Sequence, residues 1–353
     1  MQSYDKLLFG VALRPYFAFR KFFSIKFCRN EIFAYLCGVL DDYNTTFIKR
    51  YQYEIFHRSA ALNPSFHSYS LIIMLTFQNL SYSYRSGYPV LKNVNAAVSP
   101  GICLLLGENG AGKTTLLGLS SGLLRTASGF VEFDGECPGD RLPSTMSDIF
   151  YLSDSWQSPF KDIYTTARFH GAFYPNLDLD MLASNLEAFG LTGREKLKSL
   201  SLGMRRKTYI AYALALKPRL LLLDEPANGL DIDSKKELRR MVSRCIGDDQ
   251  TVIISTHTVA DLEVLYDTIM LLHKGELLLS VSTALVSEKL GFVTSSMPIQ
   301  EALYMETEGA SFNAIVRAES PYGSAIDFEL LYSAIVSGKA PEIIEILKED
   351  GKQ

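Results

Sequence analysis

The chain has 353 residues, a formal net charge of −4 and five cysteines. This length is sufficient for one large or two ordinary domains, and the small negative charge gives no electrostatic footprint for nucleic acid, which we therefore do not expect as a partner. The scattered cysteines lack metal-site spacing and favour a reducing compartment, and no uncharged apolar run approaches the ~18–20 residues that span a bilayer.

Residues 1–73 differ in composition from the rest of the chain. They hold 17 of the 41 aromatic residues and a formal charge of +4, so the remainder carries −8. Neither helical nor strand periodicity persists in them, and they lack the architecture of a signal peptide. One interpretation is a basic, aromatic segment that lies on a membrane surface. We favour the other, a segment outside the working domain that is disordered or lies upstream of the true start at Met74.

From Met74 onward, apolar strand-like runs alternate with helical patterns, which predicts an α/β fold with a mainly parallel sheet. The expected strands are residues 75–84, 90–98, 102–106, 129–134, 148–152, 219–223, 251–255 and 268–272. Helices are expected from Thr114, after Gly203, over residues 233–245 and over residues 259–266. Residues 161–199 are also expected to be mostly helical, with breaks at 175–176 and 190–193. Beyond Gly275 we expect a smaller tail, with strands near 277–281 and 312–317 and helices near 326–337 and 341–348.

A glycine-rich stretch between an apolar strand and a helix fits the pattern G-x-x-x-x-G-K-[ST], which is typical of a P-loop NTPase. Its glycines allow backbone N–H groups to turn inward around a polyphosphate, and the helix N-terminus adds partial positive charge. We expect Lys113 to reach the outer phosphates of a nucleoside triphosphate and the Thr114 hydroxyl to ligate Mg²⁺. The residues expected to bind the nucleotide here are Gly107, Glu108, Asn109, Gly110, Ala111, Gly112, Lys113, Thr114 and Thr115.

An acidic pair follows the leucine-rich strand 219–223. Asp224 stands at the carboxyl end of this strand, beside the phosphate loop, where we expect it to hold Mg²⁺ through water. Glu225 is the expected general base, which orients the water that attacks the γ-phosphate. Together with Lys113, the pair predicts hydrolysis of a nucleoside triphosphate.

In this order the motifs resemble those of the ATP-binding cassette (ABC) family, the ATPase subunits of membrane transporters. Residues 200–207 look like the family's signature motif. The resemblance implies that Ser201 and the backbone at Gly203 begin a helix directed at the γ-phosphate bound by the opposite subunit. Leu202 and Met204 depart from the family pattern, which often has Gly and Gln there. Ser201 is also a suitable helix N-cap, a reading that uses the same geometry.

The same resemblance assigns roles to three more residues. Asp231 belongs to a stretch that resembles the D-loop, which lies along the dimer seam in the family. His257 resembles the switch histidine that contacts the γ-phosphate and is expected to act in catalysis with Glu225. Tyr84 resembles the aromatic residue that stacks on adenine, with Tyr82 and Tyr88 as neighbouring alternatives.

The loop after strand 148–152 departs from the family's Q-loop. Aligned by eye, Asp154 stands where Gln or Glu is usual, and the resemblance implies that it ligates Mg²⁺ through water with a shorter reach. Gln157 is the alternative for this role. Because the Q-loop links the nucleotide to the membrane partner in the family, the departure puts that coupling in question.

The resemblance also indicates how the chain is divided. The expected parts are the segment 1–73, an ABC-type nucleotide-binding domain at 74–280 with a helical subdomain at about 155–205, and a small C-terminal extension at 281–353. Residues 173–177 resemble the helical subdomain of bacterial exporter-type ATPase subunits, and residues 326–335 resemble their closing helix.

The sequence therefore predicts an ATP-hydrolysing subunit of an exporting ABC transporter. We expect it to lie in the cytoplasm on the inner face of the cell membrane, under a separate integral membrane permease. A second ATP-binding subunit, identical or different, would complete a dimer that ATP closes and hydrolysis reopens. The alternative is a soluble cassette ATPase with a regulatory or translation-associated role. Translation-type proteins usually carry two cassettes in one chain, whereas this chain has one.

Overall fold

The computed structural model describes residues 73–85, 87–258, 266–318, 325–338 and 341–348. These residues lie within one compact unit, Tyr69–Gln353. Our expectations for residues 1–72 and for a helix over 259–265 fall outside the described residues. Met74, where we expected the working domain to open, is buried, and its N–H donates to the Val98 carbonyl oxygen.

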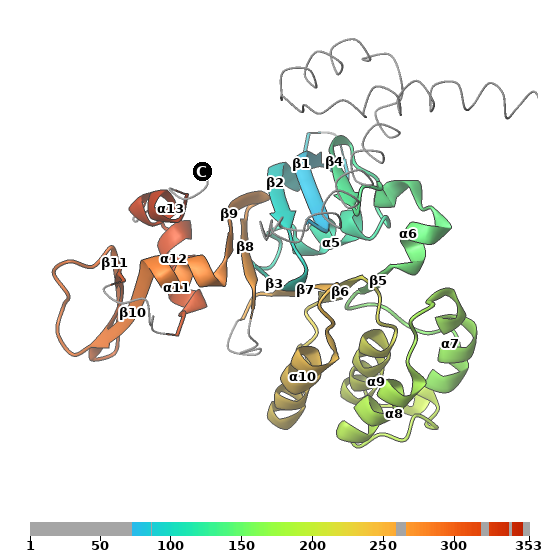
Figure 1. Ribbon diagram of the computed structural model, residues 1–353. Helices are drawn as coiled ribbons and strands as arrows, with labels where there is room; N and C mark the ends of the chain where they lie inside the picture. The colour runs from blue at the N-terminus through green and yellow to red at the C-terminus, as the bar shows by residue number, and fades with distance from the viewer. Residues whose placement is uncertain (1–72, 86, 259–265, 319–324, 339–340, 349–353) are drawn as a thin grey trace, which may run out of the picture. The chain divides into compact units, whose positions relative to one another are not determined.

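A six-stranded sheet forms the centre of this unit (Figure 1). Its strands, in spatial order, are β5 (Ile149–Leu152), β6 (Leu220–Asp224), β7 (Thr251–Thr256), β3 (Gly101–Leu106), β8 (Thr268–His273) and β9 (Glu276–Ser282). All neighbours pair in parallel except β8 and β9, which are antiparallel. Both faces of the sheet are covered, and for this reason β6 and β7 are continuous apolar or small-residue runs rather than alternating ones. The predicted mainly parallel sheet is confirmed.

A second, antiparallel sheet and the helix α5 (Lys113–Ser120) cover one face of the central sheet. The second sheet has the order β2 (Leu91–Val98), β1 (Leu75–Tyr82) and β4 (Ser128–Phe133). Alternate residues of the central strands, such as Leu105 and Leu222, share one core with α5 and this sheet. The strands expected first in the chain therefore pair with each other and with β4, outside the parallel sheet.

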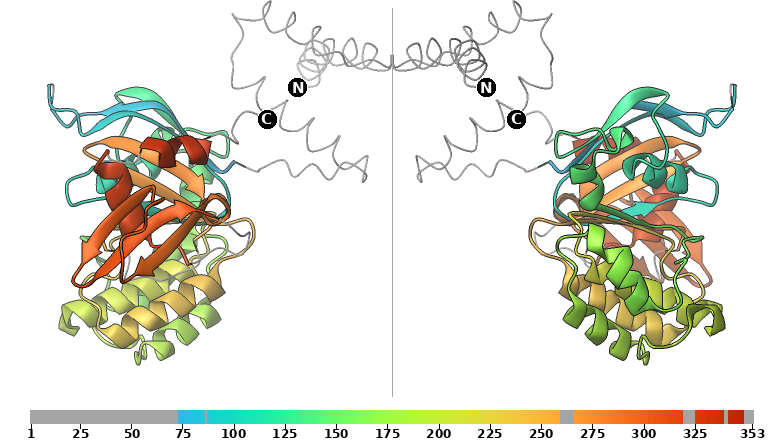
Figure 2. Two further views of the ribbon diagram at one scale, coloured as in Figure 1. Left: turned by 90° about the vertical axis from the view of Figure 1, so that its left-hand side faces the viewer. Right: turned by 90° about the vertical axis from the view of Figure 1, so that its right-hand side faces the viewer.

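Helices cover the other face, as Figures 1 and 2 show. Leu104 and Leu223, which point away from α5, pack in a core with α8 and α9. The helices of this region are α7 (Ile163–Phe169), α8 (Leu179–Ala188), α9 (Leu202–Ala215) and α10 (Ile232–Cys245), with single turns at Gly171–Phe173 and Leu197–Ser199. The short helix α6 (Pro143–Ser147) and the single turn Pro138–Asp140 lie on the α5 side, where Met146 packs against the core that α5 shares with the second sheet. No helix in the described ranges is both long enough and apolar enough to cross a membrane.

The C-terminal extension is a small antiparallel sheet with three helices. Its elements are α11 (Thr283–Lys289), β10 (Leu290–Ser295), β11 (Tyr304–Glu308), β12 (Ser311–Arg317), α12 (Phe328–Val336) and α13 (Pro341–Lys348), and the strand order is β10-β12-β11. We did not expect α11, β10 or β11 from the sequence. Ile315 and Leu331 belong to the same core as Leu104, so the extension packs on the cassette.

Candidate functional site

The phosphate loop connects β3 to α5, and two of its glycines are required by its shape. Gly112 has a φ of +109°, a conformation that side chains with a Cβ rarely adopt, and it precedes the first residue of α5. A Cβ on Gly107 would lie 2.3 Å from the Leu272 carbonyl oxygen, and this backbone atom cannot move away as a flexible side chain could. The loop therefore turns tightly against the end of β8 and aims the N-terminus of α5 at the space above it. This geometry suits a polyphosphate.

Lys113 is 5% exposed and points back into the loop. Its Nζ donates to the carbonyl oxygens of Gly107 at 2.6 Å and Glu108 at 3.2 Å, and it lies 3.3 Å from Glu225 Oε1. A buried ammonium needs such partners because removing it from water is costly. Anionic phosphate oxygens would be stronger partners than the two neutral carbonyls.

Asp224 is buried at the end of β6 and accepts hydrogen bonds from three hydroxyl groups. The Thr114 hydroxyl donates to Oδ2 at 2.8 Å, the Tyr151 hydroxyl to Oδ2 at 3.1 Å, and the Ser255 hydroxyl to Oδ1 at 2.5 Å. Burial, and then the nearby Asp224 charge, raise the pKa of Tyr151, so its hydroxyl stays a donor. The structure thus brings together Thr114 and Asp224, the two residues that we expected to hold Mg²⁺.

Tyr151 and Ser255 were not identified from the sequence. Ser255 lies directly opposite Asp224 in the β6–β7 register, so its position in the expected neighbouring strand was the available signal. Tyr151 lies in β5, on the other side of β6. Its hydroxyl crosses to Asp224 only because these strands are adjacent, and strand order is not written in local sequence.

Glu225 adopts an unusual backbone conformation that directs its side chain into the site. Its φ is +47°, and its N–H donates to the backbone carbonyl and side-chain hydroxyl oxygens of Ser255, both at 3.1 Å. For a residue with a Cβ, such a conformation costs about 1–3 kcal/mol and is typical of functional sites. It places Oε1 3.0 Å from His257 Nδ1.

The Glu225 carboxylate also carries an acceptor with room for another donor. Oε1 is buried and lies close to both His257 Nδ1 and Lys113 Nζ, yet neither side chain meets it with hydrogen-bond geometry. Oε1 can therefore still accept a hydrogen bond from a further donor. Water is a donor of the required kind, so the residues present fit a nucleotide with its attacking water.

Tyr84, which follows β1 in the chain, lies beside the first turn of α5. Its hydroxyl is 3.2 Å from Thr115 Oγ1, its ring is 59% exposed, and its ring centroid lies 5.1 Å from that of Tyr82 in an edge-to-face pair. An exposed ring fixed at this edge of the phosphate loop is suited to stacking on a base. Of the two alternatives, Tyr82 packs edge to face against the Tyr84 ring, and Tyr88 is 77% exposed.

The signature and D-loop residues adjoin each other. The Ser201 hydroxyl accepts from the Met204 N–H and caps α9, and Asp231 caps α10. A Cβ on Gly203 would lie 3.2 Å from the Gly229 carbonyl oxygen. Asp231 also accepts from Lys207 Nζ at 2.9 Å, and this bond, with those from Ser234, holds the pKa of its carboxyl well below the ordinary range. Among the described residues, the polar contacts of Ser201 and Asp231 are with α9 and α10 and not with the phosphate loop.

Asp154 pairs with Arg206 of α9, a contact that the sequence analysis did not anticipate. The Arg206 guanidinium bonds the Asp154 carboxylate and also donates to the backbone carbonyl oxygens of Asp224, at 3.0 Å, and Glu225. Arg206 therefore joins the expected Q-loop to the turn that carries the acidic pair. The role of Asp154 as a metal ligand stays a prediction.

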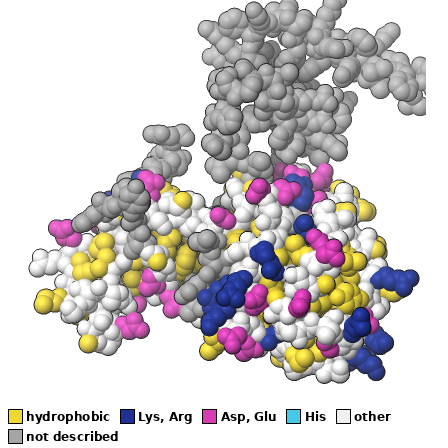
Figure 3. Space-filling view, turned by 60° about the horizontal axis from the view of Figure 1, so that its bottom comes forward, with side chains coloured by type: hydrophobic (Ala, Val, Ile, Leu, Met, Phe, Trp, Pro, Cys, Tyr) yellow, Lys and Arg dark blue, Asp and Glu magenta, His cyan; other side chains and the backbone are white. Residues whose placement is uncertain are grey.

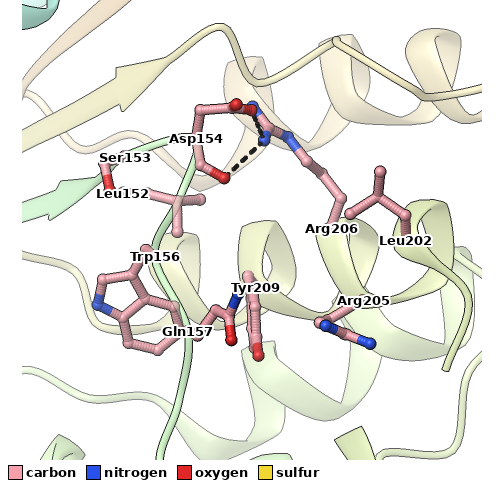
Figure 4. A pocket seen from close by; sticks show the side chains of 9 residues that line it. All are labelled: Leu152, Ser153, Asp154, Trp156, Gln157, Leu202, Arg205, Arg206 and Tyr209. Carbon is pink, nitrogen blue, oxygen red and sulfur yellow. Dashed lines mark hydrogen bonds and ion pairs between the residues drawn. The ribbon is translucent and has the colours of Figure 1, made fainter. Parts of the chain in front are cut away.

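A small pocket that is open to solvent lies beside this ion pair (Figure 4). It lies between the loop after β5 and the first turns of α9. Its lining residues are Leu152, Ser153, Asp154, Trp156, Gln157, Leu202, Arg205, Arg206 and Tyr209. Both candidates for the Q-loop residue, Asp154 and Gln157, thus face one cavity.

No cluster of three or more His, Cys, Asp or Glu side chains is arranged to hold a metal in the part of the chain that the structure describes. Mg²⁺ in nucleotide sites needs only one or two protein ligands, because substrate phosphates and water supply the others. The Thr114–Asp224 pair has this chemistry: one hydroxyl and one carboxylate oxygen, 2.8 Å apart.

The chain was compared with families, curated proteins and solved structures. The family model described as ABC transporter matches residues 91–228. The energy-coupling factor transporter ATP-binding protein EcfA of Methanothermobacter thermautotrophicus is 33% identical over 220 residues, covering 58% of this chain and 70% of that protein. The lantibiotic transport ATP-binding protein SrtF of Streptococcus pyogenes is 32% identical over 209 residues, covering 58% of this chain and 90% of that protein.

Solved structures agree on the fold. An ATP-binding subunit of an ABC transporter aligns with a TM-score of 0.53 at 23% identity, over 60% of this chain and 90% of that one. A dimeric ATP-binding cassette in a post-hydrolysis state, bound to ADP and Pi, aligns with a TM-score of 0.52 at 22% identity, over 59% of this chain and 98% of that one. Taken with the sequence relatives, these findings identify the chain as a member of the ATP-binding proteins of ABC transporters, an ATPase with the ABC cassette fold.

Proposed function

We propose that this chain powers export through a separate membrane permease, as one of two ATP-binding subunits that close on ATP and reopen after hydrolysis. The observation that carries the proposal is the convergence of Thr114 on Asp224, and of Lys113 and His257 on Glu225. The direction rests on the resemblance of residues 173–177 and 326–335 to exporter-type subunits. The place of action is the inner face of the cell membrane, where the permease is anchored.

Each residue of this cluster has a proposed task. Lys113 exchanges the loop carbonyls for phosphate oxygens of ATP. Thr114 and Asp224 would hold Mg²⁺, which neutralises charge on the phosphates. Glu225 accepts a hydrogen bond from the attacking water through its buried Oε1, and His257, 3.0 Å from that oxygen, fixes the carboxylate. Tyr84 stacks on the adenine.

The opposite subunit is proposed to complete each site with its Ser201 helix. In this chain the N-terminal turn of α9 is open to solvent, since Leu202 is 77% and Met204 40% exposed. A helix N-terminus attracts anions, so this turn can meet a γ-phosphate carried by a second subunit. Closure on ATP and opening on ADP then follow from different affinities of the two states for the nucleotide.

The permease is proposed to contact the cavity that Asp154 and Gln157 line (Figure 4). Arg206 links the wall of this cavity to the backbone of Asp224 and Glu225, so a change at the acidic pair can reach the partner. On the face drawn in Figure 3, basic side chains are interspersed with acidic ones. Mixed charge of this kind supports a protein partner over a nucleic acid.

Glu225→Gln tests the proposed chemistry. The variant should bind ATP normally, lose roughly 10²-fold or more of its hydrolysis rate, and accumulate an ATP-bound dimer, because the amide cannot take a proton from water. Lys113→Ala should instead weaken ATP binding. Glu237→Gln is the matched control, since Glu237 pairs with Arg240 on the outside of α10. Hydrolysis by Glu225→Gln at the rate of this control would overturn the assignment.

A further inference from the structure

The C-terminal extension reaches the phosphate loop through one side chain. Tyr332 lies in the middle of α12, and its hydroxyl oxygen accepts a hydrogen bond from the Glu108 N–H at 3.3 Å. Glu108 is the second residue of the phosphate loop. The two residues are 224 positions apart in the chain, so this contact exists only because α12 packs behind the loop.

The second partner of the hydroxyl is His273, at the end of β8. Tyr332 Oη lies 3.4 Å from His273 Nδ1. A phenolic oxygen has one hydrogen and two lone pairs, so it can accept from the Glu108 N–H and bond His273 Nδ1 at the same time. Burial is the largest influence on Tyr332 and raises its pKa, so the hydroxyl keeps that hydrogen. Tyr332 therefore bridges the phosphate loop and the end of β8.

The same end of β8 already supports the loop from below. The Gly275 N–H donates to the Ala111 carbonyl oxygen at 3.0 Å, and the Cα of Gly107 packs on the Leu272 carbonyl. These contacts fix the two ends of the loop's turn. The Glu108 peptide between them is fixed by Tyr332 on its N–H side and by Lys113 Nζ on its carbonyl side.

We propose that Tyr332 is a positioning residue for ATP, through which the C-terminal extension sets the affinity of the phosphate loop for the nucleotide. This inference rests on the proposed role of Lys113. When Lys113 turns to phosphate oxygens, the Glu108 carbonyl loses its ammonium partner, and the Tyr332 hydroxyl is then the contact that holds this peptide in its binding conformation. A loop that is ordered before ATP arrives loses less conformational entropy on binding, so its affinity is higher.

The test compares Tyr332→Phe with Tyr304→Phe in the full chain. Phenylalanine keeps the ring of Tyr332 in its packing and removes only the bridging oxygen. Tyr304 lies in the same extension, but its hydroxyl bonds Glu306 Oε1 at 2.6 Å and the Ser337 side chain, and neither residue belongs to the phosphate loop. ATP affinity is measured by equilibrium binding and as KM, with kcat determined in the same assays and the melting temperature without nucleotide as the measure of folding.

We expect Tyr332→Phe to raise both Kd and KM for ATP about 2- to 10-fold, the range for losing one neutral hydrogen bond, with little change in kcat. Tyr304→Phe should match the wild-type Kd. An unchanged Kd for Tyr332→Phe would overturn the proposal, and so would a lower melting temperature with no change in Kd, since that describes a purely structural contact. Equilibrium binding requires no hydrolysis and no permease, so failure of the transport proposal would be seen separately.

Discussion

The Asp224 side chain is held in place by several hydrogen bonds. Its carboxylate is buried, and hydroxyls from three different elements, α5, β5 and β7, donate to it. Such donors fix the orientation of the carboxylate. In metal sites, residues that orient a ligand contribute to affinity without touching the metal.

Tyr151→Phe should therefore weaken the site for Mg²⁺. Removing this hydroxyl leaves Asp224 Oδ2 with Thr114 alone, which is itself an expected metal ligand. We expect the Mg²⁺ concentration for half-maximal ATP hydrolysis to rise about 10-fold or more, the lower end for loss of an orienting contact. Tyr174→Phe is the control, because the Tyr174 hydroxyl donates to the Ile149 carbonyl oxygen at 3.3 Å. Coincident Mg²⁺ curves for the two variants would contradict this role.

Among single residues, sequence analysis identified candidates for the site where they belong to short contiguous motifs. The structure brings Thr114 to 2.8 Å from Asp224 and His257 to 3.0 Å from Glu225, while their roles in binding and catalysis stay predictions. Arg206 was missed because its contacts to the Asp224–Glu225 turn depend on how α9 packs under β6. For residues of this kind the information lies in tertiary packing, and no local pattern carries it.

The loop after β5 is joined to the helical region by a cluster of aromatic rings. The Trp156 ring lies 4.8 Å from that of Tyr209 and 5.7 Å from that of Phe150, measured between centroids. His170, at the end of α7, contacts Phe150 and Trp156, and its Nδ1 lies 2.8 Å from the Tyr212 hydroxyl oxygen. The cluster therefore couples α7 and α9 to the edge strand β5.

His170 makes this cluster sensitive to acid. Burial lowers the pKa of His170 below its ordinary value of about 6.5, so between these two values the unfolded chain binds more protons than the folded one. The His170 contribution to stability is therefore complete at neutral pH and is lost as the pH falls below about 6.5. His170→Phe keeps an aromatic ring and removes the titration. The stability advantage of the wild type over this variant should shrink from about pH 7.5 to about pH 5 in denaturant unfolding. Parallel curves over this range would contradict it.

The elements that the sequence predicted well are long or continuously apolar. Strands β6 and β7 are buried along their whole length, and α9 and α10 each have 14 residues. The missed elements, α6, α11, β10 and β11, have 5, 7, 6 and 5 residues, and β10 and β11 are largely partly buried or exposed. Weak periodicity over so few residues leaves little signal, because packing on the cassette stabilises them rather than their own propensity.

At the scale of the whole molecule, the proposed dimer gives each subunit two half-sites. The phosphate loop with Asp224 and Glu225 forms one, and the capped N-terminus of α9 with the D-loop turn forms the other. If the second half-site serves a partner, then lesions in Lys113 and Ser201 must complement each other between chains. Homodimers of Lys113→Ala should be inactive because every site lacks its phosphate lysine. Homodimers of Ser201→Arg should be inactive because a bulky cation replaces the hydroxyl at every cap.

Mixing the two variants separates the cross-subunit model from its alternative. In a mixed dimer the model places both lesions in one site, so the other site has an intact Lys113 and an intact opposing Ser201. Up to about half of the wild-type rate should return, and less if both sites must act together, because coupled residues do not contribute additively. If Ser201 served the nucleotide of its own chain, each site would carry one lesion and mixing would restore nothing. The measurement is the ATPase rate against mixing ratio, after subunit exchange between identical chains has been demonstrated with two distinguishable tags. A rate that stays at the level of the single variants would then exclude the shared site. Under the cross-subunit model, every mixed dimer contains one site with both Lys113 and Ser201 intact, and that site should hydrolyse ATP.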